Sequence, residues 1–180
     1  LAYSGGSGTA GAPYQIGSVN DLLYLRTHTG DYGKCFILTA DIDLDPNLPG
    51  GQVFTTAVIA PDTNNSTSDF NGAPFSGVFD GNNHTISNLT IDTNGAGNYY
   101  LGLFGEIGLN SQIKNLGLKD VNIIGGDNSL FLGGLAGWSA SGSNISNCHS
   151  TGTVSSGAGS NHLGGLAGDN DGTISDCFST

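Results

Sequence analysis

The chain has 180 residues, of which 31 are glycine and only 11% are charged, and its formal net charge is −11. Four basic residues are too few to neutralise the phosphates of a nucleic acid or to hold the chain at an anionic membrane surface, so the composition disfavours both classes of partner. No apolar run approaches the roughly 20 residues that a membrane-spanning helix needs. The length is sufficient for one domain with a substantial core.

Residues 1–33 predict an extended entry segment followed by a short capping helix. Residues 1–13 are rich in Gly, Ser and Ala, which is typical of an extended or flexible segment. Residues 16–26 (IGSVNDLLYLR) predict the helix, because Ser18 can cap its N-terminus and the apolar residues that follow recur on one face. A helix placed before a run of strands is suited to cover the open end of stacked β-structure.

Residues 35–45 (CFILTADIDLD) alternate between apolar and polar side chains and predict a strand. One face of that strand carries Asp41, Asp43 and Asp45, whose carboxylates are the ligand type that calcium prefers. These alternate positions span about 13 Å along a strand, which is too wide for one ion to meet all three. A solvated strand face is therefore the favoured interpretation, and calcium is the one cofactor left open.

Two further segments precede the repeats. Residues 53–60 (VFTTAVIA) predict another strand, and residues 61–72 (PDTNNSTSDFNG) predict a polar loop inserted out of the core path. Asn64 and Asn65 in this loop each start an Asn-x-Ser/Thr pattern and are candidate glycan acceptors.

The second half of the chain is built from a repeated unit. The segments LGLFG, LGGLAG and LGGLAG begin at residues 101, 132 and 163, so successive starts lie 31 residues apart (132 − 101 and 163 − 132). Self-similarity at such a period indicates stacked supersecondary units. With a further start near residue 75, the prediction places β-helix coils over residues 34–180. The last coil is incomplete, from which we expect the chain to be a segment of a longer protein.

Within the units, the segments ISNLTI, IKNLGL, ISNCHS and ISDCFS align with one another. The alignment predicts a ladder of stacked isoleucines at Ile86, Ile113, Ile145 and Ile174. It also predicts a ladder of corner side chains at Asn88, Asn115, Asn147 and Asp176. A second strand aligns Val78-Phe79 with Leu103-Phe104, Leu135-Ala136 and Leu166-Ala167. Stacked Asn side chains can bond the backbone of neighbouring coils, and a polar binding stripe is the alternative role.

About three short strands per unit, separated by corners rich in Gly, Asn and Ser, predict the fold class. No such strand can bury a face alone, whereas like residues stacked on like form a continuous core. The prediction is an all-β fold: a right-handed parallel β-helix, or solenoid, with a short N-terminal helical cap. A β-sandwich would need chain-reversing hairpins, and a leucine-rich repeat is disfavoured by the long period.

Cys148 and Cys177 fall at equivalent positions of successive units. Neighbouring coils lie roughly 4.8 Å apart, within the Cα range that a disulfide allows. The alternative is a stack of buried thiols that pack as small apolar groups. Leu89 and Leu116 occupy the same column in the alignment, so an apolar group suffices there.

No catalytic constellation emerges from the repeats. A lyase needs a base and cationic groups beside its substrate, but Lys114 and Lys119 are the only basic residues in the repeats. Glycoside hydrolysis needs two carboxylates at a set separation, and the acidic residues here are scattered among corners. The chain is therefore predicted not to be an enzyme.

Residues 132–153 and 163–180 resemble the GLUG-motif repeats of bacterial and archaeal surface proteins, through LGGLAG, GSNISNCHSTGT and NDGTISDCFST. The segments FILTADIDL and FSGVFDGNNHTISNLTI, at residues 36–44 and 75–91, are similar to the N-terminal part of the same secreted architecture. The resemblance implies a β-helical repeat at the cell surface, as in adhesin-like proteins. It implies no particular activity.

The expected function is that of an extracellular structural or adhesive repeat protein, part of a surface stalk or a self-assembling fibre. Its partners are expected to be further repeats or like subunits, which meet the open end of the β-helix. The alternative is a carbohydrate-binding or polysaccharide-degrading β-helix module, with aromatic side chains grouped on one outward face. Trp138 is the expected glycan contact, and the other aromatic candidates are Tyr99, Tyr100 and Phe131.

Overall fold

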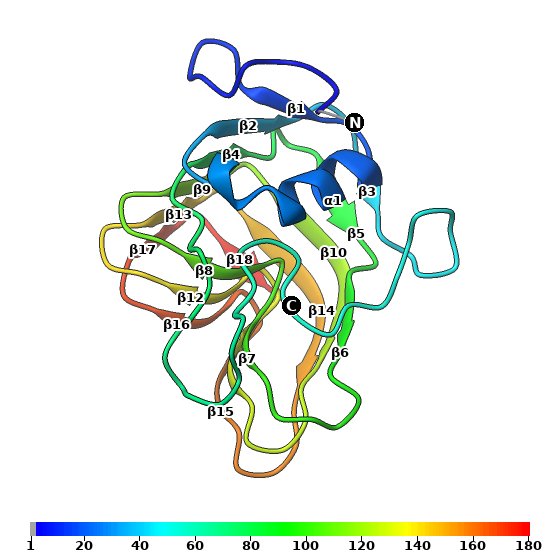
Figure 1. Cartoon of the computed structure of the whole chain (residues 1–180), viewed down its shortest axis with the longest axis vertical. Coiled ribbons are helices and arrows are strands. Elements are labelled where there is room, and N and C mark those ends of the chain that lie inside the picture. Colours follow the sequence, from blue (N-terminus) through cyan, green and yellow to red (C-terminus); the bar gives the residue numbers. More distant parts are fainter. Residues whose placement is uncertain (1–2) are drawn as a thin grey trace.

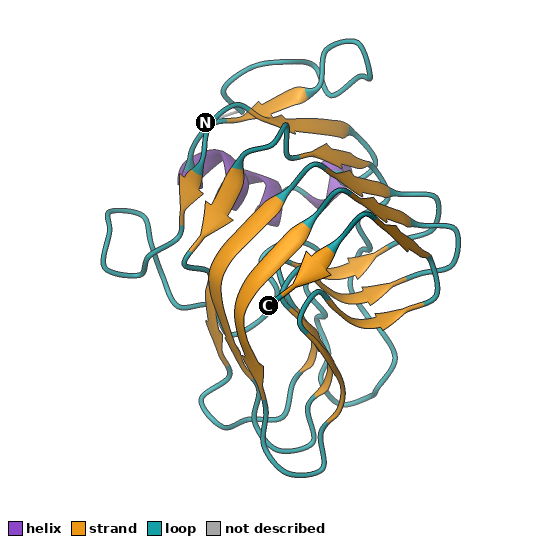
Figure 2. Ribbon diagram, turned by 180° about the vertical axis from the view of Figure 1, so that it is seen from behind, coloured by secondary structure: helices purple, strands orange, loops and turns teal. Residues whose placement is uncertain are grey.

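Short parallel strands stack on one another through most of the computed structural model, which describes residues 3–180 (Figures 1 and 2). They form a β-solenoid of about three turns, with one short α-helix near the N-terminus. The predicted all-β solenoid with an N-terminal helix is thus confirmed. Among the described residues, no helix is both long and apolar enough to cross a membrane.

The strands form four sheets, and within each sheet the strands that pair belong to successive levels of the stack. The first sheet contains β1 (Tyr14–Ile16), β2 (Cys35–Leu38), β4 (Val78–Asp80), β9 (Gln112–Lys114), β13 (Asn144–Ser146) and β17 (Thr173–Ser175). The second contains β3 (Ile42–Asp43), β5 (Thr85–Ser87), β6 (Thr90–Asp92), β10 (Gly117–Ile124), β14 (His149–Ser155) and β18 (Phe178–Ser179). The third contains β7 (Tyr99–Leu101), β11 (Leu130–Gly133) and β15 (Asn161–Gly164). The fourth contains β8 (Phe104–Ile107), β12 (Ala136–Ser139) and β16 (Ala167–Asn170).

One turn of the solenoid visits the four sheets in order, as β9, β10, β11 and β12 do. The repeat is in register across the third sheet, where Leu101, Leu132 and Leu163 are Cα partners. Because every strand pairs in parallel with its equivalent in the next coil, like side chains stack along the axis. The stacked Leu, Ile and Phe side chains make one continuous apolar core.

The isoleucine ladder is correct in its last three members and wrong in its first. Ile113 pairs with Ile145, and Ile145 with Ile174, in the first sheet. The partner of Ile113 on the other side is Phe79, whereas Ile86 lies in the second sheet between Ile42 and Leu118. Ile86, the isoleucine of the first unit, therefore lies in the second sheet and not in the first. Its strand comes one place later in the coil than the alignment predicts.

The same offset corrects two other parts of the sequence alignment. Val78-Phe79 lies in β4 of the first sheet, not beside Leu103-Phe104 in the fourth. Asn88 does not share a column with Asn115, because the Asn88 N–H bonds the carbonyl of Lys119 at 2.9 Å. The cause is that each coil contains several short strands of similar composition, so alignment by residue type alone leaves their order ambiguous.

The segment before the repeats is less regular than the sequence predicts. The expected strand over residues 35–45 is interrupted after Leu38, and its two parts, β2 and β3, belong to different sheets. Residues 53–60 form no strand, although Phe54 and Ile59 each make an isolated parallel bridge to a strand of the next coil. Residues 61–72 are a loop, as predicted.

The helix α1 (Val19–Thr27) begins at the predicted cap, and a single 3₁₀ turn, η1 (Thr29–Asp31), follows it. The Ser18 Oγ accepts a hydrogen bond from the Asp21 N–H at 3.2 Å, which satisfies one free donor of the first turn. Leu22 and Leu25 are fully buried in the same apolar core as the stacked strands. The helix and β1 therefore close the N-terminal end of the solenoid (Figure 1).

Candidate functional site

The segment LGGLAG at residues 132–137 is a tight corner between the third and fourth sheets. β11 ends at Gly133 and β12 begins at Ala136, while Leu132 and Leu135 point into the core and are fully buried. A Cβ added at Gly137 would lie 2.5 Å from the Cα of Tyr100 in the preceding coil, closer than real Cβ atoms approach. Glycine is therefore required at position 137, because the backbones of two coils pass close to each other there.

An aromatic column runs along the outside of this corner; we define it as Phe70, Tyr100, Phe131 and His162. The rings of Tyr100 and Phe131 are stacked with centroids 4.8 Å apart, and the ring of His162 lies 4.8 Å from that of Phe131. Phe70, from the loop of residues 61–72, packs edge-on against Tyr100 at 5.1 Å. The Tyr100 hydroxyl donates to the carbonyl of Ser68 at 2.7 Å, so the loop is fastened to the column.

The backbone of the aromatic column is in a conformation that bulky residues rarely adopt. Tyr100, Phe131 and His162 have φ values of 56°, 62° and 59°. A left-handed conformation in a non-glycine residue costs free energy, and it persists only where the surrounding structure enforces it. Here it recurs at the same position of three coils, so it belongs to the geometry of the repeat.

Trp138 and three carboxyl groups lie beside the aromatic column. The Trp138 ring is 6.3 Å from that of Tyr100, and its Nε1 donates to Asp171 Oδ2 at 3.1 Å. His162 Nδ1 lies 3.3 Å from Asp169 Oδ2. Glu106 is the strand partner of Trp138, and burial raises the pKa of its carboxyl to about 7. Burial, together with the negative charge of Glu106, raises the pKa of Tyr100 to about 12.

The structure brings three of the four predicted aromatic candidates together: Tyr100, Phe131 and Trp138. Tyr99 lies in the adjacent row, where Leu130 is its strand partner. The sequence prediction missed His162 and Phe70. His162 could have been found, because positions 100, 131 and 162 are separated by the repeat period, whereas Phe70 lies in a loop that no periodicity describes.

The last coil presents an open end. Ile174 is 38% exposed and Leu163 is 42% exposed, although their partners in the preceding coil, Ile145 and Leu132, are completely buried. Phe178 in β18 is 58% exposed. Within the described residues, β15, β16, β17 and β18 each pair with a strand on one side only. Apolar columns that run through the core are thus uncovered at this face.

The predicted corner ladder of Asn side chains exists from Asn115 onward. Asn147 Nδ2 donates to Asn115 Oδ1 at 2.9 Å, and Asn115 Nδ2 donates to Asp80 Oδ1 at 3.0 Å. Asn115, Asn147 and Asp176 have φ values of 53°, 51° and 54°. Asn and Asp tolerate this left-handed corner better than other residues with a Cβ. The ladder therefore links neighbouring coils at this corner through side-chain hydrogen bonds.

Asp80 and Asp43 each accept a hydrogen bond from an Asn side chain at a coil corner. Burial alone would raise the pKa of Asp80, but hydrogen bonds from Asn115 and the Asn82 N–H, with the nearby Lys114 ammonium, outweigh it and lower the pKa. In the second sheet, Asn88 Nδ2 donates to Asp43 Oδ1 at 2.8 Å. This bond is the main cause of the lowered pKa of Asp43.

The three calcium candidates do not share one strand face. Asp41 precedes β3 and accepts a hydrogen bond from the Thr85 N–H at 2.8 Å, which with the side chain of His84 lowers its pKa. Asp43 binds Asn88, and Asp45 accepts from the Asn47 N–H at 2.9 Å. Across residues 3–180 the structure contains no group of three His, Cys, Asp or Glu side chains that could hold a metal ion.

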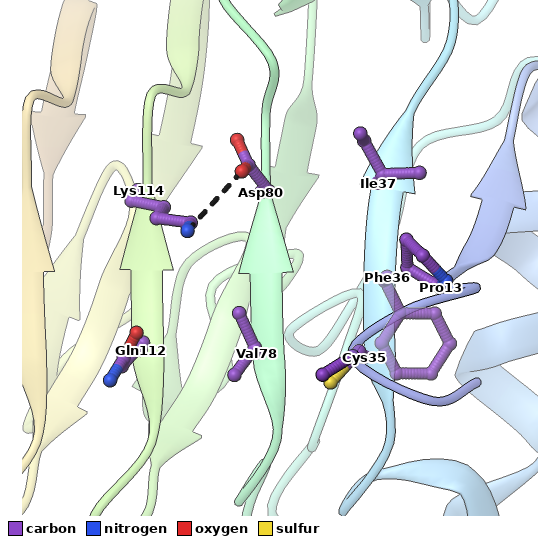
Figure 3. A pocket seen from close by; sticks show the side chains of 9 residues that line it. Pro13, Cys35, Phe36, Ile37, Val78, Asp80, Gln112 and Lys114 are labelled. Atoms are coloured by element: carbon purple, nitrogen blue, oxygen red, sulfur yellow. Dashed lines mark ion pairs between the residues drawn. The ribbon is translucent and has the colours of Figure 1, made fainter.

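A shallow groove of about 370 Å³ lies on the outer face of the first sheet, beside Ala10 and Pro13 of the entry segment (Figure 3). Its floor includes Cys35, Val78 and Gln112, which are neighbours across β2, β4 and β9. The Lys114 ammonium and the Asp80 carboxylate form an ion pair at 3.4 Å along one side. The charges of the groove thus compensate one another.

Comparisons with known proteins identify the repeated motif and two similar proteins. Residues 132–155 match the family described as the GLUG motif, which confirms the resemblance seen in the sequence. Over 167 residues, or 91% of its length, the chain is 34% identical to halomucin of Haloquadratum walsbyi. Over 120 residues it is 33% identical to a Gly-rich membrane protein of Evansella cellulosilytica. The chain spans only 2% of the first relative and 12% of the second. No solved structure matches it significantly.

Proposed function

We propose that this chain, which carries GLUG repeats in a β-solenoid, is a structural module of an extracellular surface protein. We further propose that it joins more coils or like subunits through its open C-terminal end. The similarity to a small part of halomucin, a much longer protein, supports a role as one segment of a larger assembly. The repeated residues pack in the apolar columns, bond along the corner ladder or form the tight corners. The repeat is therefore best suited to a structural function.

The observation that carries this proposal is the open end of the last coil. Its strands offer unpaired backbone groups, and its apolar columns at Leu163, Ile174 and Phe178 are uncovered. Exposed strand edges are templates for pairing with another strand. At the opposite end, α1 and β1 pack over the first coil.

The self-association of the chain tests the proposal. Sedimentation velocity over a wide range of concentrations should show dimers or larger species that form through the C-terminal end. The double variant Ile174→Lys/Phe178→Lys should remain monomeric, because it places charges on the open columns. The matched control is Val53→Lys/Leu109→Lys, which changes two exposed apolar residues outside the last coil and should associate like the parent chain. A parent chain that stays monomeric at high concentration contradicts the joining of like subunits through this end.

A second candidate function, glycan binding, is favoured by the grouping of Trp138 with the aromatic column. Carbohydrates pack against exposed aromatic faces, and Trp138 and Phe131 are half-exposed. The stacking of Tyr100 on Phe131 leaves Trp138 as the ring best placed to meet a ligand. A glycan array should then detect binding that Trp138→Ala abolishes and that the control Tyr24→Ala, on α1, leaves intact. Absence of binding to every polysaccharide tested would leave the structural function alone.

A further inference from the structure

We propose that Cys148 and Cys177 are a modification site: in the presence of a small-molecule disulfide they form an inter-coil disulfide that fastens the last coil to the one before it. The register of the strands places the two residues opposite each other. Ser146 pairs with Ser175 on one side of them, and His149 pairs with Phe178 on the other. Neighbouring strands lie about 4.8 Å apart, inside the Cα separation of ~4.4–6.8 Å that a disulfide needs.

The Cys177 sulfur is oriented toward Cys148, whereas the Cys148 thiol points toward the carbonyl of Ile113 in the preceding coil, at 3.8 Å. The Sγ of Cys177 lies 3.3 Å from the backbone nitrogen of Cys148, whose N–H it accepts. Both thiols also donate to the carbonyl two residues earlier in their own coil, at 3.2 Å for Cys148 and 3.1 Å for Cys177. The two side chains thus share one arrangement, and rotation about the Cα–Cβ bonds is the movement that bond formation requires. The remaining cysteine, Cys35, lies in β2 at the other end of the first sheet.

The two thiols differ in accessibility, which sets the order of the chemistry. Cys148 is 2% exposed, whereas Cys177 is half-exposed because it lies in the uncovered last coil. The Cys177 thiolate can therefore attack a disulfide such as oxidised glutathione, releasing one glutathione thiol and leaving a mixed disulfide. The Cys148 sulfur then attacks the Cys177 sulfur and releases the second glutathione. Two protein thiols lose two electrons and two protons, and one oxidised glutathione becomes two reduced ones.

The second step is the slower of the two. Burial, the first cause, and the neighbouring Cys177 raise the pKa of the Cys148 thiol to about 12, which keeps it protonated at neutral pH. The bond it forms closes a loop between residues 148 and 177 and holds β17 and β18 against β13 and β14. A coil stacked on the open end would cover Cys177, so the bond must form before the end is covered.

Peptide mapping of the oxidised chain tests the inference. The full chain is reduced, freed of reductant, incubated with oxidised glutathione, alkylated and mapped by mass spectrometry without reduction. We expect one peptide pair that joins Cys148 to Cys177, and a melting temperature about 5–10 °C above that of the reduced chain. Dithiothreitol should reverse both. The measurement is made on dilute, monomeric chain, so its outcome is independent of end-to-end association.

Three variants provide the controls. Cys35→Ser should keep both the peptide pair and the rise in melting temperature. Cys177→Ser, which changes a half-exposed residue, should fold and lose both, and Cys148→Ser should lose the pair as well. The inference is overturned if the main product is a mixed disulfide at Cys177 that never resolves, or if Cys35 or a second chain provides the partner. A correct pair without a higher melting temperature overturns the fastening role.

Discussion

The Asn residues of the ladder are required by the backbone conformation of the corner, whereas Gly137 of the LGGLAG corner is required by the lack of space beside it. At Asn115 and Asn147 the backbone itself is left-handed, and a polar side chain both tolerates that conformation and bonds along the axis. Gly137 lacks a positive φ; it is restricted by the Tyr100 backbone that passes beside it. Both requirements recur in the three units that begin at residues 101, 132 and 163, which is why they are visible as a motif.

Substituting Gly137 tests this steric requirement. Gly137→Ala should lower the free energy of unfolding by about 2–3 kcal/mol, because the new Cβ meets backbone atoms that cannot move aside. Urea denaturation followed by circular dichroism measures the change. Gly30→Ala is the matched control, since a Cβ there meets nothing within 4 Å, and it should change the free energy by less than about 0.5 kcal/mol. Equal effects in the two variants would refute the steric explanation.

Glu106 is the only glutamate of the chain and makes its stability depend on pH. Burial raises the pKa of its carboxyl from 4.5 to about 7, so between these values the folded chain holds a proton that the unfolded chain releases. The contribution to stability is therefore present below pH 4.5 and is lost as the pH rises through 7. The free energy of unfolding should fall across this window by at most about 3 kcal/mol.

The variant Glu106→Gln isolates this contribution. Its free energy of unfolding should lack the fall between pH 4.5 and 7 that the parent chain shows. Above pH 7 the variant should be more stable than the parent, because an uncharged amide replaces a buried carboxylate. Unfolding curves at several pH values measure the difference. Asp120→Asn, which removes an exposed carboxylate, should retain the parent's dependence across this window. If Glu106→Gln kept the full slope, the titrating group would lie elsewhere.

At the scale of the element, α1 has a different function from the strands. Each strand is covered by a neighbouring coil, but the first coil has only α1, β1 and the entry segment beside it. The buried side chains of Leu22 and Leu25 take the place that another coil's apolar columns would fill. Asp21 holds the start of the helix, because its Oδ2 accepts from the Gly17 N–H at 2.9 Å and from the Ser4 hydroxyl at 2.7 Å.

Truncation of the buried face of α1 should expose this covering role. Leu22→Ala should lower the free energy of unfolding by about 2–5 kcal/mol, as removal of a fully buried leucine leaves a cavity in the core. Leu23→Ala, on the half-buried side of the same helix, should cost distinctly less while changing helix propensity equally. Chemical denaturation of both variants measures the difference. A cost for Leu22→Ala no larger than that of Leu23→Ala would mean that the helix does not close the core.

At the scale of the whole molecule, a stack that is closed at one end and open at the other should unfold from the open end. In a solenoid each coil contacts only its neighbours, so local stability depends on how many sides are covered. Hydrogen exchange should therefore be fastest in β17 and β18, slower in β13 and β14, and slowest in β9 and β10. Mass spectrometry of peptides from each coil measures this order. Uniform protection from β9 to β18 would show that the coils unfold as one unit.

Much of the architecture follows from the sequence alone, because a fixed period repeats the same environment. Residues 31 positions apart are chemically alike, so their stacking into parallel columns, the tight LGGLAG corner and the pairing of Cys148 with Cys177 could be inferred without coordinates. The cap at Ser18 was also predictable, since capping is a local interaction between a side chain and the next turn.

Only the tertiary structure decided where the non-repeating parts lie. Ile86 and Ile113 are 27 residues apart, whereas Ile113 and Ile145 are 32 apart, and this irregular spacing hides a shift of one strand that the pairing reveals. The position of Phe70 against Tyr100 likewise depends on how a loop without periodicity folds back. Periodicity determines which residues are equivalent, but contacts between unlike segments depend on the path of the chain in space, which no local pattern records.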